Sequence, residues 1–454
     1  MQSGIRHLVS IDDLSPAEIL GLFEHARAFA EDLRGFAHLC PGLISASLFY
    51  EASTRTRLSF ESAMLRLGGG VLSAAEMKQS SASKGESLAD TVRVVGSSYA
   101  DVIVLRHSSE GAARLAAQYS PVPVVNGGDG SHEHPTQTLC DLYSLWLERG
   151  RIEDLEVVLA GDLRYSRTIH SFVYALARFG AKVVCVPQPG FELPPYVLQR
   201  LREEFGVEPQ RADASRLGDL SKGADAVYLT PQKPHQLSLF TPGSGGAEGG
   251  LPVERVDALY MTRPQTERFR DSQLDETQYV HLDKKRMAAE SLRHAVVMHP
   301  LPRRDEISAD IDGDPRSIYF KQAGRGVPIR MAILAFLLGR IELEAPRLAV
   351  DVRYYPLQAG PNPCVNPSCV SRTETRHVTP LFKLGSRIPL RAHCGYCSQE
   401  IAAPLVGCTT TRAAHARETP AARRIRPDHL VFFHSADEAR ALGFEPAAAA
   451  GAAT

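Results

Sequence analysis

The sequence contains no long hydrophobic run, and no stretch approaches the roughly 18 consecutive apolar residues of a membrane-spanning helix. It also lacks a net charge of either sign, since 51 Lys and Arg oppose 52 Asp and Glu. This balance predicts neither a nucleic acid nor a membrane as the partner of the whole chain. Residues 1–16 contain no apolar segment of the secretory type, so we expect a cytoplasmic protein.

Cysteine is scarce over most of the chain. Cys40, Cys140 and Cys185 are isolated and stand in apolar surroundings, which predicts small buried thiols. The other five of the eight cysteines fall between residues 364 and 408, and this concentration indicates a separate kind of site.

What the sequence does contain is an alternation of short apolar runs with amphipathic segments. Its 454 residues, 44% hydrophobic and 23% charged, are typical of a soluble globular protein of about three domains. Strand–helix alternation predicts parallel sheets with helices on both faces and ligands at the carboxyl ends of the strands. The predicted strands are residues 101–105, 122–125, 157–160, 182–186 and 224–229, and the predicted helices are 87–96, 111–118, 135–148, 166–179, 195–205 and 327–339. Ser15, Pro16 and Glu18 have the pattern of a capping box, which predicts an earlier helix beginning there.

Several polar residues fall where predicted strands end. The sequence Ser-Thr-Arg-Thr at 53–56 follows an apolar run and opens a helix, where amides with partial positive charge bind phosphate. Arg106 directly follows a strand, and His134 and Gln137 begin the next helix. Each has an ordinary alternative, since Ser53 could be a plain helix cap, Arg106 a solvated charge and His134 a polar helix-start residue. Together they indicate an anion and carbonyl site.

A second group of polar residues follows later strands. Arg167 stands after the strand 157–160, and Arg263 and Gln265 follow another apolar run. A guanidinium can bind a carboxylate in a bidentate manner, so these residues predict a substrate with two carboxylates, with unliganded surface arginines as the alternative. Residues 298–303 end a strand with two prolines, which leaves carbonyls that can accept hydrogen bonds from a substrate NH₂ group.

Two segments have little to bury. Residues 73–87 are small and polar, which predicts a surface loop in which Lys84 is either a solvated charge or a cation reaching a ligand. Between Pro231 and Pro252 Gly, Pro and Ser predominate, and this composition predicts a mobile loop.

The chain resembles the transcarbamylase family, and within it the aspartate carbamoyltransferases. The resemblance rests on ordered motifs from His7 to Gly339, namely FYEASTRTRLSFESAMLRLGG, SSASKGESLADT, VLRHSSEGAARLA, GGDGSHEHPTQTLCDLY, GDLRYSRTIHS, YMTRPQTERF, MHPLPRRDEI and IYFKQAGRGVPIRMAILAFLLG. A resemblance to ornithine carbamoyltransferases would require a cysteine in the turn at Met298 and no Arg-x-Gln pair at 263–265. Ser166 departs from the glycine usual in the family, and the 231–252 loop is longer than usual.

The resemblance implies a site for carbamoyl phosphate and L-aspartate. The phosphate would be held by Ser53, Thr54, Arg55, Thr56 and Arg106, and the carbonyl and amide ends by His134, Gln137 and the backbone carbonyls of Leu301 and Pro302. The carboxylates of aspartate would be held by Arg167, Arg263 and Gln265. Ser80 and Lys84 would arrive from a neighbouring subunit, which implies a homotrimer or a multiple of it. Glu51 would pair with Arg167 and Arg268 as the two domains close.

The implied reaction is attack of the aspartate amine on the carbamoyl carbon. A tetrahedral intermediate would expel phosphate and yield N-carbamoyl-L-aspartate for de novo pyrimidine biosynthesis. No covalent nucleophile and no organic cofactor is expected, because catalysis would come from holding the reactants together and from donors aimed at the developing oxyanion. The residues expected to be catalytic are Arg55, Thr56, Arg106, His134 and Lys84, of which Thr56, Arg106 and His134 would be the oxyanion donors. The departing phosphate could take the amine proton.

Four of the late cysteines form two close pairs. Cys364 and Cys369 stand in a C-x4-C pattern, and after 24 intervening residues Cys394 and Cys397 stand in C-x2-C. Two such pairs with a β-like stretch at 379–391 between them predict a closed structural zinc site, and disulfides are the alternative. The module resembles the zinc domain of the aspartate carbamoyltransferase regulatory chain, which docks on catalytic chains. The residues that separate it from the catalytic part, 340–363, are too few for a nucleotide-binding domain, so we expect a role in assembly or stability without the usual nucleotide effectors.

We therefore expect an α/β protein with two doubly wound parallel-sheet domains and a small C-terminal β-rich zinc domain. The expected boundaries are 1–150 for the carbamoyl phosphate domain, completed by 293–340, then 151–292 for the aspartate domain, 341–405 for the zinc module and 406–454 for a poorly defined tail. The segment after Cys408 faintly resembles a metal-binding module without its later cysteines, which predicts a degenerate remnant or a short docking helix. A scaffold descended from the enzyme, or a zinc module that binds nucleic acid, is the alternative function, and the retained site chemistry favours an active enzyme.

Overall fold

The computed structural model describes residues 4–75, 85–212, 224–230, 256–263, 281–289, 292–343, 353–374 and 378–447. Ser80, Lys84, Gln265 and Arg268, together with the predicted loop between Pro231 and Pro252, lie outside these ranges. Within the ranges, none of the helices combines the length and the apolar character that crossing a bilayer would require.

The first sheet has four parallel strands in the order β2-β1-β3-β4. Its strands are β1 (Ile44–Phe49), β2 (Gly70–Ala75), β3 (Val102–His107) and β4 (Val124–Asp129). Side chains alternate between its two faces, so Val102 and Val104 join one core while Ile103 and Leu105 join another. Burial on both faces is the pattern that parallel sheets produce, and the strands predicted at 101–105 and 122–125 are confirmed.

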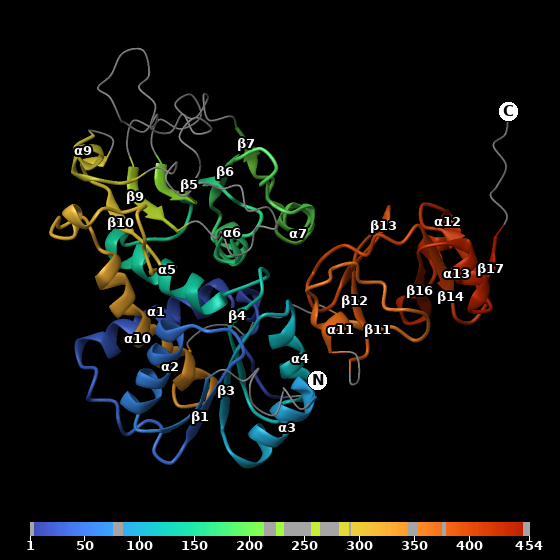
Figure 1. Cartoon of the computed structure of the whole chain (residues 1–454), viewed down its shortest axis with the longest axis horizontal. Coiled ribbons are helices and arrows are strands. Elements are labelled where there is room, and N and C mark those ends of the chain that lie inside the picture. Colours follow the sequence, from blue (N-terminus) through green and yellow to red (C-terminus); the bar gives the residue numbers. More distant parts are fainter. Residues whose placement is uncertain are drawn as a thin grey trace.

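Helices cover both faces of this sheet (Figure 1). On one side are α1 (Pro16–Glu31), α2 (Thr54–Arg66), α5 (Pro135–Arg149) and α10 (Tyr319–Leu337), and on the other are α3 (Leu88–Ser98) and α4 (Ala112–Tyr119). The predicted capping box of α1 is confirmed, because the Ser15 side chain accepts from the Glu18 amide and the Glu18 side chain accepts from the Ser15 amide.

The second sheet has six parallel strands in the order β10-β9-β8-β5-β6-β7. Its strands are β5 (Glu156–Gly161), β6 (Lys182–Pro187), β7 (Gln210–Arg211), β8 (Ala224–Leu229), β9 (Val256–Met261) and β10 (Val296–Met298), and its helices are α6 (Arg167–Arg178), α7 (Pro195–Phe205) and the short α9 (Lys284–Met287). One continuous apolar core runs from α1 through α5 and α6 to the inner face of this sheet. The two α/β units are therefore packed together at the face that α5 and α6 share.

Helix α10 differs from the prediction. The sequence places its start at residue 327, whereas the helix begins at Tyr319 and contains Pro328. A proline inside a helix removes one hydrogen bond and costs roughly 3 kcal/mol. Packing of α10 against α1, α2 and α5 outweighs this cost, and sequence periodicity does not report such tertiary contacts.

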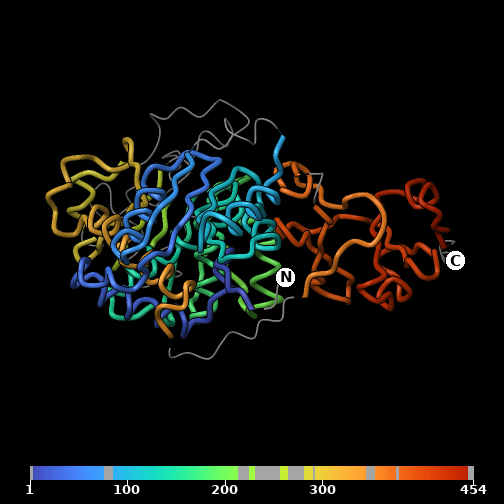
Figure 2. Tube along the Cα trace, turned by 90° about the horizontal axis from the view of Figure 1, so that it is seen from below, coloured from blue at the N-terminus to red at the C-terminus, as the bar shows by residue number. Residues whose placement is uncertain are grey.

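Two small β modules follow and project to one side of the α/β body (Figures 1 and 2). The first contains β11 (Tyr355–Pro356), α11 (Val370–Thr373), β12 (Leu381–Arg387) and β13 (Leu390–Cys394), so the predicted β-like stretch at 379–391 is confirmed. The second contains β14 (Leu405–Cys408), β15 (Ala413–Ala416), α12 (Pro420–Arg424), β16 (Leu430–Phe433), α13 (Ala436–Ala441) and β17 (Glu445–Pro446).

The second β module is a correction to the sequence analysis. The sequence predicts a poorly defined tail over residues 406–454, whereas the structure has a four-stranded sheet there. Buried aromatic side chains of Phe432, Phe433 and Phe444 support it. The strands are only two to four residues long, so their periodicity is too short for a sequence pattern to reveal.

The first β module contacts both α/β units. The Glu110 amide donates to the Ser368 carbonyl at 2.8 Å, and the Glu110 side chain accepts from Asn366 Nδ2 at 2.8 Å. On the second unit, Lys383 Nζ lies 2.7 Å from Glu204 Oε1 in α7. The module thus bridges the β3–α4 connection of one unit and a helix of the other.

Candidate active site

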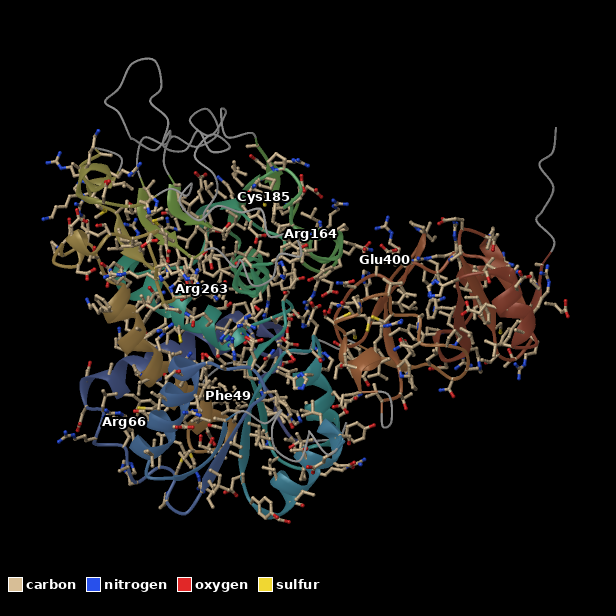
Figure 3. All side chains as sticks on the ribbon, in the orientation of Figure 1. Phe49, Arg66, Arg164, Cys185, Arg263 and Glu400 are labelled. Carbon is tan, nitrogen blue, oxygen red and sulfur yellow. The ribbon has the colours of Figure 1, made fainter. Side chains whose placement is uncertain are left out.

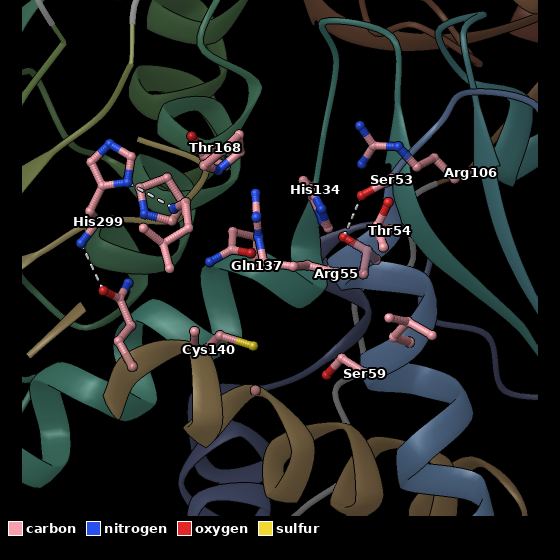
Figure 4. A pocket seen from close by; sticks show the side chains of 18 of the residues that line it. Ser53, Thr54, Arg55, Ser59, Arg106, His134, Gln137, Cys140, Thr168 and His299 are labelled. Carbon is pink, nitrogen blue, oxygen red and sulfur yellow. Dashed lines mark hydrogen bonds between the residues drawn. The ribbon is translucent and has the colours of Figure 1, made fainter. Parts of the chain in front are cut away.

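A cavity of about 720 Å³ lies at the carboxyl ends of the strands, between the two α/β units. Eleven of the residues predicted for the site line it, which are Ser53, Thr54, Arg55, Thr56, Arg106, His134, Gln137, Arg167, Arg263, Leu301 and Pro302. In Figure 4 the start of α2 and His299 stand on opposite sides, with Gln137 between them. Arg263 follows β9 and lies between the two units (Figure 3). The other three predicted residues, Ser80, Lys84 and Gln265, are outside the described part of the chain.

The first turn of α2 forms one wall of the cavity. Ser53 precedes the helix, but its side chain makes no capping bond and instead donates to Thr56 Oγ1 at 3.0 Å. Burial and, after it, the charge of Arg263 lower the pKa of Arg55. Helix amides and two guanidinium groups therefore concentrate positive charge in the cavity, and an anion would relieve it.

Arg106 and Arg167 come from different α/β units and share the carboxylate of Glu51. Glu51 Oε1 accepts from Nη2 of Arg106 and lies 3.3 Å from Nη2 of Arg167. The other terminal nitrogen of each guanidinium donates to a backbone carbonyl, at 3.0 Å to Gly127 of β4 for Arg106 and at 2.8 Å to Gly130, directly after β4, for Arg167. The family resemblance predicts the pairing of Glu51 with Arg167 but not its pairing with Arg106.

His134 and Gln137 begin α5. His134 is 5% exposed, and its amide donates to Ser171 Oγ in α6 at 3.1 Å. Gln137 donates through Nε2 to Asp141 Oδ1 at 2.9 Å. A carboxylate accepts but does not donate hydrogen bonds, so this contact assigns the NH₂ group of Gln137 to Asp141 and leaves its Oε1 to accept from a ligand.

The turn at 299–302 forms the opposite wall. The Leu301 amide donates to His299 Nδ1 at 2.8 Å, so the ring hydrogen is on Nε2, which lies 2.8 Å from Glu306 Oε1. Burial is the largest influence on this ring and lowers its pKa. Leu301 adopts a positive φ of 50°, which is uncommon for a residue with a side chain.

Sequence reasoning missed several residues around the cavity. Gln322 and Arg330 of α10, Thr168 of α6 and His299 line it, and Asp141 lies directly behind the wall. Those in α10 lie in the middle of a helix rather than at a strand end, so the strand-end rule does not find them. Cys140 is the buried thiol that was predicted, and burial raises its pKa to about 11.

The four predicted cysteine ligands come together in the first β module. Their sulfur atoms lie within 4.8 Å of one another and all four residues are buried. The distance is 3.6 Å from Cys364 Sγ to Cys397 Sγ and 3.7 Å from Cys369 Sγ to Cys394 Sγ. Disulfide sulfurs lie about 2.05 Å apart, whereas a tetrahedron with metal–sulfur bonds of about 2.3 Å has edges of about 3.8 Å. The cluster therefore fits a metal bound by four thiolates.

Three family models match the chain. They are the carbamoyl phosphate binding domain of aspartate/ornithine carbamoyltransferase over residues 6–146, the aspartate/ornithine binding domain of the same family over 251–337, and the metal binding domain of the aspartate carbamoyltransferase regulatory chain over 362–404.

Curated relatives match the catalytic part. The aspartate carbamoyltransferase catalytic subunits of Methanocaldococcus jannaschii and of Clostridium botulinum are both 42% identical, over 337 and 340 residues, and each alignment covers 74% of this chain and 98% of the relative. The solved structure of the M. jannaschii catalytic subunit has a TM-score of 0.59 at 40% identity and covers 74% of this chain and 98% of its own. Aspartate transcarbamoylase from Trypanosoma cruzi, in complex with carbamoyl phosphate and aspartate, has a TM-score of 0.57 at 33% identity and covers 73% and 94%.

Proposed function

The chain belongs to the aspartate carbamoyltransferase family, and on that premise we propose that the cavity between its two parallel sheets is the active site. The protein is a transferase that moves the carbamoyl group of carbamoyl phosphate to the amine of L-aspartate and releases phosphate. By its family, the reaction belongs to de novo pyrimidine biosynthesis. The single observation that carries the assignment of the site is the convergence of the α2 N-terminus, Arg106, Arg167 and Arg263 on one cavity.

Carbamoyl phosphate is proposed to bind against the start of α2. Its phosphate would accept hydrogen bonds from the amides and hydroxyls of residues 53–56 and from the guanidinium groups of Arg55 and Arg106. The carbonyl oxygen would face Thr56, Arg106 and His134. The NH₂ group would donate to Gln137 Oε1 and to the carbonyls of Leu301 and Pro302, which line the opposite wall.

L-aspartate is proposed to bind on the side of the second sheet. Arg167 and Arg263 would each hold a carboxylate, with Gln265 adding an amide. The amine would then attack the carbamoyl carbon, and Thr56, Arg106 and His134 would stabilise the oxyanion of the tetrahedral intermediate. Holding two anionic reactants side by side supplies most of the acceleration, and the departing phosphate takes the amine proton.

A homotrimer, or a multiple of it, is proposed as the assembly, with Ser80 and Lys84 entering the site of a neighbouring subunit. Three large apolar side chains support it, since Leu58, Leu65 and Leu72 are 52%, 59% and 46% exposed. They lie on α2 and on β2, the edge strand that leads into residues 76–84. Large apolar side chains that are exposed on elements next to this segment are typical of a protein interface.

The four-cysteine cluster is proposed to hold a structural zinc ion, since four buried thiolates in a closed tetrahedral set are the ligands typical of structural zinc. The module would support assembly or stability. The residues before it, 340–363, leave no room for a nucleotide-binding domain, so we propose that CTP and ATP do not act as tight effectors. A cytoplasmic location and the domain boundaries 1–150, 151–292, 341–405 and 406–454 belong to the same proposal.

The test is a carbamoyl-transfer assay with purified protein, carbamoyl phosphate and either L-aspartate or L-ornithine. We expect carbamoyl-aspartate, and we expect Arg55→Ala and Arg263→Ala each to lower kcat/KM by about 100-fold or more, as loss of a charged donor does. Arg202→Ala is the control, because Arg202 is a half-exposed arginine of α7 outside the cavity. Citrulline instead of carbamoyl-aspartate would contradict the substrate assignment, and no product with either amine would favour a scaffold.

A further inference from the structure

Asp141 is a buried carboxylate that the reaction described above does not use. It lies in α5, one turn after Gln137, and is 1% exposed. Its side chain accepts three hydrogen bonds, each of 2.9 Å. Oδ1 accepts from Gln137 Nε2 and Gln322 Nε2, and Oδ2 accepts from the Tyr260 hydroxyl. A buried carboxylate without partners would be costly, so these three donors account for its presence there.

The first hydrogen bond sets the orientation of the Gln137 amide. Without Asp141, the Gln137 side chain could rotate by half a turn and present NH₂ to the cavity. With Asp141 accepting from Nε2, only Oε1 is left for the ligand. An acceptor at this point suits the NH₂ group of carbamoyl phosphate.

The second hydrogen bond extends to the opposite wall through Gln322. Its Nε2 donates to Asp141, so its Oε1 is the atom that accepts from the His299 amide, at 2.9 Å. The His299 ring then accepts from the Leu301 amide. Asp141 is therefore connected through two side chains to the turn that presents the Leu301 and Pro302 carbonyls.

The third hydrogen bond reaches the second sheet. Tyr260, in β9, donates to Asp141, and its ring stacks on that of Tyr228 with centroids 4.3 Å apart. The Tyr228 hydroxyl lies 2.8 Å from Thr168 Oγ1, and Thr168 follows Arg167 in α6. Arg263 lies two residues after the end of β9. This branch therefore supports the residues proposed for aspartate.

We propose that Asp141 is a positioning residue for carbamoyl transfer. Its carboxylate orients the acceptor oxygen of Gln137 toward the carbamoyl NH₂ group. Through Gln322 it orients the 299–302 turn toward the same group, and through Tyr260 it aligns the aspartate side of the cavity. This inference rests on the function proposed above. It assigns Asp141 no contact with substrate.

The ionised form of Asp141 is the one that can accept all three bonds. Burial raises the pKa of this carboxyl to about 7. The hydrogen bonds from Gln137, Tyr260 and Gln322 and the charge of Arg330 act in the opposite direction and lower the pKa. These groups, with Tyr228 of β8 and Cys140 of the same helix, are the titratable or polar groups that face it. A protonated carboxyl can give its hydrogen only to the Tyr260 hydroxyl, while Oδ1 still accepts from the NH₂ groups of Gln137 and Gln322. Protonation therefore changes the Tyr260 branch, and the KM for aspartate should rise as the pH falls through about 7.

The experiment measures kcat and both KM values for the full chain and two Asp141 variants between pH 6 and 9. This window extends about one to two units on each side of the expected transition. Asp141→Leu should raise the KM for carbamoyl phosphate by about tenfold or more, as loss of oriented hydrogen bonds does. Asp141→Asn keeps one oxygen for both amides, so it should recover most of the affinity for carbamoyl phosphate. It should lose the pH dependence near 7, because an amide does not titrate there. A folded Asp141→Leu protein with unchanged KM values and pH profile would overturn the proposal.

Two branch variants keep the test decisive if Asp141→Leu does not fold. Gln322→Ala should raise mainly the KM for carbamoyl phosphate, and Tyr260→Phe mainly that for aspartate. Tyr143→Phe is the matched control, because this buried tyrosine of α5 has a hydroxyl that bonds to none of the described residues. If both branch variants leave both KM values unchanged in an active enzyme, this inference alone fails. If the unmodified chain makes no carbamoyl-aspartate, the proposed function fails and the inference with it.

Discussion

Glu51 carries one carboxylate that two arginines from different α/β units share. Arg106 follows β3 in the first unit and Arg167 begins α6 in the second. Each guanidinium also donates to a backbone carbonyl in or directly after β4. Because the Glu51 side chain is 31% exposed, solvent screens the attraction and the pairing adds little to stability. Its consequence is geometric, since it holds two proposed substrate-binding groups at a defined separation.

We expect Glu51→Gln to lower kcat/KM for aspartate by about tenfold, because Arg167 would lose the charge that orients it. The unfolding temperature should change little. Steady-state kinetics with aspartate varied at saturating carbamoyl phosphate measures the effect. Glu148→Gln, which changes a carboxylate paired with Arg325 outside the cavity, is the control. Equal losses in both variants would contradict a specific role for Glu51.

At the scale of elements, α1 shows how much local chemistry decides. Ser15, Pro16 and Glu18 predicted its first turn, and the structure has the reciprocal capping bonds. In α10 the local signal failed, since the predicted start at residue 327 lies eight residues after the observed start at Tyr319. The difference arises because a cap acts within four residues, whereas α10 is stabilised by helices distant in sequence.

We expect Ser15→Ala to lower the free energy of unfolding by about 1 kcal/mol, the usual value of a helix cap. Both KM values should stay unchanged, because α1 does not line the cavity. Urea denaturation followed by circular dichroism measures the loss. Ser97→Ala, at an exposed serine of α3, should lose less. A shifted KM in Ser15→Ala would show that α1 influences the site.

At the scale of the whole molecule, the first β module contacts both α/β units. Asn366, between two of the cysteines, donates to Glu110 of the first unit, and Lys383 contacts Glu204 of the second. A single small module therefore spans the two halves between which the cavity lies. Its own core is limited, so the proposed metal would supply much of its folding free energy.

We expect the purified chain to contain one zinc ion, and its removal by a strong chelator to unfold the first β module. The α/β body should stay largely folded, because two of its three cores contain none of the four cysteines. The third core, between the first sheet and α3 and α4, includes them and should loosen. Metal analysis, together with limited proteolysis before and after chelation, measures both effects. Cys364→Ser should behave like the chelated protein, and Cys185→Ser, a buried cysteine far from the cluster, should not. A metal-free preparation that resists proteolysis at this module would contradict the prediction.

The α/β class and the order of strands and helices in the body follow from the sequence alone. So does a set of strand-end residues that proved to line one cavity. These are local properties, because hydrophobic periodicity and the carboxyl ends of parallel strands can be read within short windows. The cysteine cluster was equally visible, since spacing alone indicates four ligands. The roles of the site residues, the domain boundaries, the zinc and the trimer stay predictions.

The residues behind the cavity walls could be identified only from contacts in the folded protein. Asp141 meets Tyr260 across 119 residues and Gln322 across 181, and no local pattern connects them. The same holds for Glu51 and Arg106, and for the short strands of the second β module. Burial and hydrogen bonding depend on distance in space, and a sequence records distance along the chain.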